Sequence, residues 1–152
     1  MRKLMTGAII ALAMAAGPAL ADAPGAPVEA LMTEYFKLWN ANDGAAITSR
    51  IYQFDQTTNP MQTLAGFNAS YAQLKAQGYD HSVLKSVHAC LLTPNLAMAE
   101  LRYSRMKTDG TAMPPADRAG IYMAKKTKEG WRISQIISMD ASAKLDCASF
   151  KG

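Results

Sequence analysis

The first residue that suggests chemistry is Tyr35, which lies in the stretch EYFKLWNAND. A phenol held in a dry pocket can stabilise a developing oxyanion by donating a hydrogen bond. Tyr35 belongs to an apolar stripe at helical spacing, formed by Val28, Leu31, Met32, Tyr35, Leu38 and Trp39. We therefore predict Tyr35 on the apolar face of a helix. It is either a catalytic donor in a cavity or a core tyrosine whose hydroxyl bonds to the sheet or to water.

His88 and Asp55 are the candidate general bases. Histidine is the residue type best suited to proton transfer near neutral pH. His88 shares a strand face with Ser86 and Cys90, because side chains alternate along a strand. If this face lines a cavity, His88 is the strongest candidate. If the face is turned outward, His88 belongs to the surface or to a dimer interface. Asp55 lies in a predicted loop, where its carboxylate either takes up a proton or caps and solvates the loop.

Cys90 and Cys147 are the two cysteines of the chain. In an oxidising compartment an even count favours a disulfide, which would close a long loop and stabilise the fold by about 4 kcal/mol. The alternative is a buried free Cys90 and an exposed Cys147. His81 and His88 do not form a convincing metal-ligand pattern, and no Walker loop or dinucleotide-binding glycine pattern is present. We therefore expect no bound metal and no cofactor.

The N-terminal segment has the order of a secretory signal peptide. Arg2 and Lys3 precede the apolar run from residue 5 to residue 16, and the small-residue sequence Ala19-Leu20-Ala21 follows. The run is shorter than the roughly 20 residues that a membrane-spanning helix needs. We expect cleavage after Ala21, a soluble periplasmic or secreted product without a membrane span, and a short flexible leader at residues 22–26.

The charge of the chain gives little support to a nucleic-acid partner. The 152 residues include 16 Lys and Arg against 12 Asp and Glu, a formal net charge of +4. Cleavage after residue 21 would remove Arg2 and Lys3, which leaves 131 residues with a net charge of +2. The remaining basic residues are scattered, whereas a nucleic-acid surface needs a basic patch or stripe. The length fits one domain with a real core.

The order of the predicted elements indicates an α+β fold. Three helices are expected first, over residues 27 to about 42, 43 to 51 and 64 to 77, with Asp43 capping the second and Gly78 ending the third. Four strands separated by turn signals follow at Ser82 to Leu92, Leu96 to Lys107, Arg118 to Thr127 and Trp131 to Asp140. We expect helices on one face of an antiparallel sheet, a domain at 27–140 and a tail at 141–152.

Two stretches, YFKLWNAND and KEGWRISQI, together with the order of elements, resemble the nuclear transport factor 2-like (NTF2-like) superfamily. This superfamily includes SnoaL-like polyketide cyclases and ketosteroid isomerases. The resemblance implies a cone-shaped α+β barrel, in which three helices pack in the concavity of a curved antiparallel sheet and enclose a cavity. It also implies a possible homodimer through the sheet. Because this fold serves many functions, the resemblance does not define a reaction.

Ketosteroid isomerases carry a tyrosine on the first helix, followed five residues later by Asn and eight later by Asp. The chain repeats this spacing at Tyr35, Asn40 and Asp43. The family places its general-base Asp directly before a proline, where this chain has Asn59 before Pro60. An amide takes up no proton at neutral pH, so the isomerase mechanism loses its base. Asn59 is then a neutral hydrogen-bonding group or a residue of the turn.

Two functions follow from these observations. The first is an exported, non-catalytic module that binds a small apolar or amphipathic molecule, or pairs with another protein through its sheet. Its cavity is expected to be lined by Tyr35, Trp39, Asn59, Phe67, Tyr71, Tyr122 and Trp131. The alternative is a cofactor-independent SnoaL-like isomerase, cyclase or dehydratase that acts on a small carbonyl compound. It needs His88 or Asp55 as the base and Tyr35 as the oxyanion donor.

Overall fold

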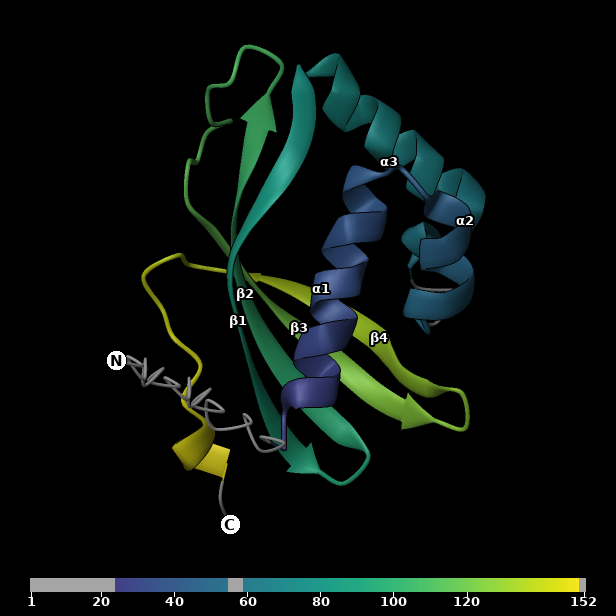
Figure 1. The fold of residues 1–152 in the computed structure, drawn as a ribbon, viewed down its shortest axis with the longest axis vertical. Coiled ribbons are helices and arrows are strands. Elements are labelled where there is room, and N and C mark those ends of the chain that lie inside the picture. Colours follow the sequence, from purple (N-terminus) through teal and green to yellow (C-terminus); the bar gives the residue numbers. More distant parts are fainter. Residues whose placement is uncertain (1–23, 55–58, 151–152) are drawn as a thin grey trace, which may run out of the picture.

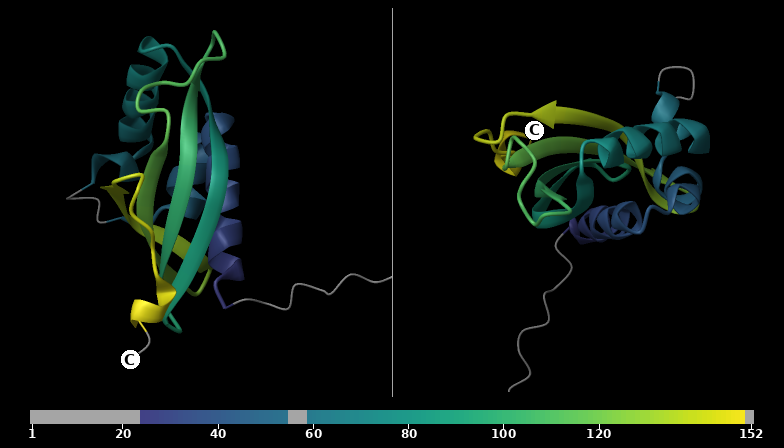
Figure 2. Two further views of the ribbon diagram at one scale, coloured as in Figure 1. Left: turned by 90° about the vertical axis from the view of Figure 1, so that its left-hand side faces the viewer. Right: turned by 90° about the horizontal axis from the view of Figure 1, so that it is seen from above.

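The computed structural model describes residues 24–54 and 59–150. The predicted signal peptide, the first two residues of the predicted leader and Asp55 lie outside these residues, and the last leader residue, Ala26, already belongs to the first helix. Within them, three α-helices precede a four-stranded antiparallel sheet of strand order β1-β2-β3-β4 (Figure 1). The helices lie along one face of the curved sheet, and the C-terminal segment runs over the other (Figure 2). The predicted α+β fold, with helices in the concavity of a curved antiparallel sheet, is confirmed.

The helices begin and end where the sequence places caps and stops. Helix α1 spans Ala26–Asn40 with a proline in its first turn. Helix α2 spans Gly44–Ala46 and continues as a π-helical turn at Ile47–Ile51, and the predicted cap Asp43 accepts a hydrogen bond from the Ala46 amide. A short 3₁₀ helix at Pro60–Gln62 leads into α3, which spans Leu64–Ala76. Gly78, at φ +84°, then turns the chain into the sheet.

The sheet consists of long strands joined mainly by tight turns. The strands are β1 (Tyr79–Thr93), β2 (Leu96–Lys107), β3 (Arg118–Thr127) and β4 (Gly130–Met139). Register shifts in the β1–β2 pair fall between Tyr79 and His81, between Leu84 and Ser86, and between Leu91 and Thr93. Such irregularities bend a strand and let a sheet curve. A 3₁₀ helix at Cys147–Phe150 ends the described chain.

The core lies between α1 and the concave face of the sheet. Helix α1 contributes Val28, Met32, Tyr35, Phe36, Leu38 and Trp39, all buried. The sheet faces them with small residues, Ala89, Ala97, Ala99 and Ala124, and with the larger Leu101, Tyr122 and Ile133. The small side chains let the start of α1 approach β1 closely, since a Cβ atom on Gly25 would lie 2.5 Å from the Ala89 carbonyl oxygen. Large aromatic residues fill the space that remains.

Candidate functional site

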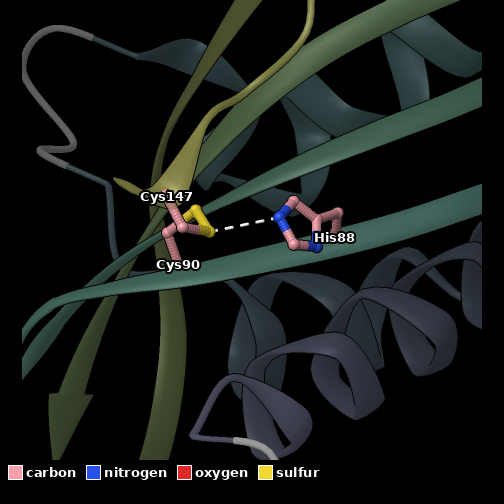
Figure 3. A group of neighbouring side chains, drawn as sticks. All are labelled: His88, Cys90 and Cys147. Carbon is pink, nitrogen blue, oxygen red and sulfur yellow. Dashed lines mark hydrogen bonds between the residues drawn. A yellow bond between two sulfur atoms is a disulfide. The ribbon is translucent and has the colours of Figure 1, made fainter. Parts of the chain in front are cut away.

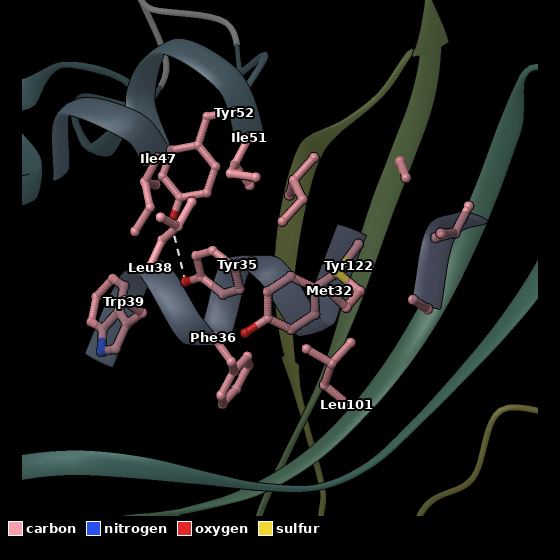
Figure 4. Close-up of a cluster of buried hydrophobic side chains, with 14 of the residues drawn as sticks. Met32, Tyr35, Phe36, Leu38, Trp39, Ile47, Ile51, Tyr52, Leu101 and Tyr122 are labelled. Carbon is pink, nitrogen blue, oxygen red and sulfur yellow. Dashed lines mark hydrogen bonds between the residues drawn. The ribbon is translucent and has the colours of Figure 1, made fainter. Parts of the chain in front are cut away.

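Tyr35 lies inside the core at the centre of a cluster of aromatic rings. Its side chain is 6% exposed, and its ring lies 5.8 Å from those of Tyr52 and Tyr122. The Tyr52 hydroxyl donates to the Tyr35 hydroxyl over 3.1 Å (Figure 4). Sequence reasoning did not nominate Tyr52, which follows the π-helical turn. The one sequence signal for Tyr52 was its position directly after Ile51, at the end of a predicted helix.

The buried phenols are neutral groups at physiological pH. Burial is the main cause that raises the pKa of Tyr35 and of Tyr122 well above the ordinary value, and it also raises that of Tyr52. A neutral phenol donates and accepts hydrogen bonds but is a poor proton acceptor. This cluster can therefore polarise a neighbouring group, but it does not supply a general base.

The space beside Tyr35 is small. A hollow of about 20 Å³ is lined by Tyr35, Phe36, Trp39, Ser82, Tyr103, Arg105 and Tyr122. A cavity of about this size holds roughly one water molecule. The roomy apolar cavity expected around Tyr35 is thus filled largely by aromatic side chains. A ligand of several heavy atoms does not fit beside the phenol in this arrangement.

The other residues expected to line the cavity mostly pack against one another. The ring of Trp39 lies 5.1 Å from that of Phe67 and 5.6 Å from that of Tyr71. Trp131 is partly buried against the core. Asn59 accepts a hydrogen bond from the Met61 amide over 3.0 Å and caps the 3₁₀ helix, which is the turn role predicted for it. Of the expected lining, Tyr35, Trp39 and Tyr122 border the small hollow.

Asn40 and Asp43, which share the isomerase spacing with Tyr35, have structural roles here. The Asn40 amide group donates to the Ser82 carbonyl and accepts from the Ser82 amide, both over 2.8 Å, and so fastens the end of α1 to β1. Asp43 accepts from the Ala46 amide over 2.9 Å and caps α2. The spacing therefore serves the fold and does not by itself indicate a catalytic site.

His88 faces away from the helices, which is the outward-facing of the two orientations predicted for it and keeps it from a role as base beside Tyr35. Its neighbours Val87 and Ala89 belong to or pack against the core, so alternation places His88 on the outer face of β1. Its ring is exposed, and Nε2 lies 3.1 Å from the Cys147 sulfur (Figure 3). The strand pattern gave the residues that share a face with His88, but not which face turns inward.

The disulfide predicted between Cys90 and Cys147 is present, with the two Cα atoms 5.3 Å apart. His88 and the two cysteines bring three potential metal-ligand atoms within 4.8 Å of one another. Cysteine binds metals as the thiolate, so the disulfide leaves only the imidazole as a strong ligand in this cluster. A groove of about 350 Å³ lies beside it, and the groove's carboxylate, Glu29, accepts a hydrogen bond from the Ala89 amide over 3.1 Å.

The tail after β4 is fastened to the outer face by a polar network as well. Glu100, 7% exposed, accepts from Arg102 Nε over 2.6 Å and from the Leu145 amide. Arg102 also donates to the carbonyls of Ala141 and Ala143. Burial alone would raise the pKa of Glu100, but the Leu145 amide and the Arg102 guanidinium lower it overall. These contacts and the disulfide fix residues 141–147 across β1 and β2.

A larger pocket lies where β3 begins and β4 ends, at a place that sequence reasoning did not identify. It measures about 380 Å³ and is lined by Tyr103, Pro115, Asp117, Arg118, Ala119, Ser138, Met139, Asp140 and Ala141. Tyr103 also borders the small hollow beside Tyr35, so it separates the two spaces. The alternation contained a signal. Tyr103 and Arg105 follow the inward-facing Leu101 in steps of two along β2, and Arg118 lies on the same face as Tyr122 at the start of β3. Charged residues at such positions mark the end of an apolar core.

The comparisons with known proteins agree with this architecture. The model of the family described as "NTF2-like protein (DUF6841)" matches residues 25–141, and the chain therefore belongs to this NTF2-like family. The expected superfamily is confirmed. A comparison with curated proteins finds no match.

Solved structures show the same fold at low sequence identity. An NTF2-like protein with a cystatin-like fold from Novosphingobium aromaticivorans is 15% identical, with a TM-score of 0.55 over 84% of this chain and 88% of that one. An NTF2-like protein of unknown function from Shewanella oneidensis is 16% identical, with a TM-score of 0.56 over 78% of this chain and 100% of that one. An uncharacterised protein from Caulobacter vibrioides is 20% identical, with a TM-score of 0.53 over 78% and 92%. These similarities establish the fold alone.

Proposed function

We propose that this protein is an exported NTF2-like module that binds a small amphipathic molecule and catalyses no reaction. The single observation that carries the proposal is the contrast between the hollow beside Tyr35 and the pocket at the end of the sheet. The hollow beside the phenol of Tyr35 measures about 20 Å³, whereas the pocket at the end of the sheet measures about 380 Å³. The larger volume falls in the range of about 300–1,000 Å³ that is typical of small-molecule sites.

The alternative, a SnoaL-like enzyme with Tyr35 as oxyanion donor, needs a base beside the phenol. Among the described residues, none of those that line the hollow carries a carboxylate or an imidazole. His88 faces outward, and Asp55 lies outside the described residues. Proton transfer from a carbonyl compound needs an acceptor within hydrogen-bonding reach. The binding role therefore has the stronger support.

Export is part of the proposal and is supported by the disulfide. A bond between Cys90 and Cys147 is stable in an oxidising compartment and rare in the cytosol of most organisms. No helix among the described residues is long and apolar enough to cross a membrane. We expect the mature chain to begin at Asp22. N-terminal sequencing of the protein recovered from the periplasm or medium tests this, and an intact N-terminus in a cytosolic fraction would contradict it.

Native mass spectrometry of the exported protein tests the binding role. We expect a mass increment from a retained small molecule that disappears on denaturation. A Ser138→Trp variant should lose the increment, because an indole at this exposed position fills the mouth of the pocket. A Gln135→Trp variant, on an exposed position of the same strand outside the pocket, should keep it. Retention of the molecule by Ser138→Trp, or a wild-type protein that is always empty, would overturn the proposal.

A homodimer through the sheet remains a prediction, and the uncovered part of the outer sheet face supports it. The tail covers part of the outer face over β1 and β2, whereas Ile137 on β4 is 45% exposed and pairs with the partly buried Ile121 on β3. The exposed Ile137 is the apolar contact that we assign to this association. We expect light scattering to report a dimer for the wild type and a monomer for Ile137→Lys. A wild-type monomer at high concentration would contradict the prediction.

A further inference from the structure

Arg118, in the pocket at the end of the sheet, has hydrogen-bond donors that the fold does not use. Its Nη2 donates to the Pro114 carbonyl over 2.5 Å. Its Nε is buried and has no acceptor among the described residues. A guanidinium carries five N–H donors, and a buried donor without an acceptor costs free energy. The side chain is therefore arranged for an acceptor that the protein itself does not provide.

The charge of Arg118 is also unmatched. Within the described residues, neither Arg118 nor Arg105 forms an ion pair, and Arg105 lies on the neighbouring strand β2. Burial is the main cause that lowers the pKa of Arg118, and the like charge of Arg105 adds to it. An arginine remains charged despite such a shift. Two neighbouring positive charges without a counter-charge favour an anion between or beside them.

The two carboxylates that line the pocket are engaged elsewhere. Asp117 forms an ion pair with Lys85. Asp140 accepts hydrogen bonds from the Ser142 amide over 2.7 Å and from its hydroxyl over 2.6 Å. Neither carboxylate forms an ion pair with Arg118. The positive charge of Arg118 is thus open to a ligand even though acidic residues border the same pocket.

The rest of the lining is suited to an apolar body. Tyr103, Pro115, Ala119 and Met139 contribute rings and aliphatic groups around a volume of about 380 Å³. A planar guanidinium matches the geometry of a carboxylate, with which it forms paired hydrogen bonds. We propose that this pocket binds a small organic carboxylate, whose charged group lies on Arg118 and whose apolar part lies against Tyr103 and Met139. The inference rests on the proposed binding function and names the chemical class of its ligand.

Titration with benzoate and with its uncharged isostere benzamide tests the assignment. We expect benzoate to shift the backbone amide signals of Ala119 and Ala141 saturably in ¹⁵N-edited NMR spectra of the full mature protein. A fragment of this size binds with a Kd of about 1 mM. Benzamide should bind about tenfold more weakly, because it cannot form the charge-assisted pair with Arg118.

Three variants isolate the guanidinium. Arg118→Gln should weaken benzoate at least about tenfold and leave benzamide unchanged. Arg118→Lys keeps the charge but loses the planar fork, so its benzoate affinity should fall between those of the wild type and Arg118→Gln. Arg50→Gln removes the same charge at an exposed site away from the pocket and should leave both affinities unchanged. Circular dichroism and thermal unfolding show whether each variant is folded before its affinity is compared.

The outcomes separate the inference from the proposed function. Equal binding of both probes, insensitive to Arg118→Gln, would overturn the carboxylate assignment and leave the small-molecule pocket intact. Absence of any saturable benzoate shift in the wild type would also overturn the assignment, while the retained-ligand measurement with Ser138→Trp judges the pocket independently. An equal loss of benzoate binding in Arg118→Gln and Arg50→Gln would reduce the effect to net charge and reject the site.

Discussion

The two faces of the sheet are covered in different ways. On the concave face, α1 and the sheet enclose aromatic and aliphatic side chains that touch on many sides, and the phenols of Tyr35, Tyr52 and Tyr122 lie among them. On the outer face, the tail is held by a few specific links, namely the disulfide and the contacts of Glu100 and Arg102. Packing stabilises the concave face through many contacts, whereas each link on the outer face fastens the tail at a single point.

The difference indicates that one part of the molecule stabilises the fold and another part is suited to binding. The phenols of Tyr35 and Tyr52 on the concave face, the first of which suggested catalysis, are neutral, buried and hydrogen-bonded to each other. The groups with unused bonding capacity lie where the packed core ends, at Arg118 and its neighbours. A packed core uses the capacity of its polar groups, so a binding site is better sought at its open end. Five predictions test this contrast between the two faces.

Removal of the disulfide should have the largest effect. A bond across a sequence separation of 57 residues restricts the unfolded chain, and its loss in Cys90→Ser/Cys147→Ser should cost about 4 kcal/mol of unfolding free energy. Urea unfolding measures this cost, and amide hydrogen exchange should show the tail released while the core stays protected. The tail variant Ser142→Ala, which keeps the disulfide, is the control. A tail that stays protected in the double variant would show that the disulfide is not its main attachment.

Truncation of a core side chain should cause the second-largest loss of unfolding free energy. Met32 is fully buried between α1 and the sheet, so Met32→Ala should lower the unfolding free energy by about 3 kcal/mol. Leu64→Ala removes a similar volume from a side chain that is 45% exposed and should cost about 0.5 kcal/mol or less. Chemical denaturation compares the two. Similar costs at both positions would contradict the tight packing described for the concave face.

Loss of the Glu100 carboxylate should have a smaller effect, confined to the outer face. Glu100→Gln removes the charge that holds Arg102 and the Leu145 amide and should cost about 2 kcal/mol. Glu129→Gln, in an exposed pair with Lys128, should cost less than about 1 kcal/mol. Urea unfolding of the two variants gives both values. Equal costs would show that the tail does not depend on this carboxylate.

The same carboxylate predicts a pH dependence of the tail. The folded pKa of Glu100 is lower than its unfolded value of about 4.3, so its contribution is fully present above that value. The contribution is lost as the pH falls through the lower folded pKa. The protection factor of the Leu145 amide, which corrects the exchange rate for its intrinsic pH dependence, should therefore fall on acidification more steeply in the wild type than in Glu100→Gln. Parallel pH profiles in the two proteins would contradict this.

The smallest expected effect concerns the phenol that first suggested catalysis. Tyr35→Phe removes the acceptor of the Tyr52 hydroxyl and leaves a buried donor unpaired, at a cost of about 1 kcal/mol. Adding Tyr52→Phe should recover most of that loss, because neither partner is then left alone. Ligand retention in native mass spectra should be unchanged in both variants. Loss of the ligand in Tyr35→Phe alone would place the binding site beside the phenol instead.

The predictable part of the structure came from local patterns. The helical stripe around Tyr35, the cap at Asp43 and the stop at Gly78 gave helices close to those observed, and the bounds predicted for β2 and β3 match the structure. The even cysteine count predicted the disulfide. The helical and capping signals depend on residues close together in the sequence, and the disulfide signal depends on the number of cysteines.

The candidate site was less predictable because it depends on how elements meet. Alternation placed His88 with Cys90, but only contacts with α1 decide which face of β1 turns inward. A count of aromatic residues indicated a lined cavity, but the volume left over depends on how the rings interlock. Arg105 and Arg118 lie on the neighbouring strands β2 and β3, and the antiparallel pairing that brings these strands side by side is a property of the sheet.

Periodicity and capping signals are local, so the class of fold and the approximate bounds of most helices and strands could be predicted from the residues alone, and an even cysteine count was enough to predict the disulfide. The enclosure of Tyr35, the outward orientation of His88 and the unused donor of Arg118 beside an open pocket became visible only once the elements were packed together. Burial and the pairing of polar groups depend on every element packed around a residue. They cannot be read from the segment that carries it.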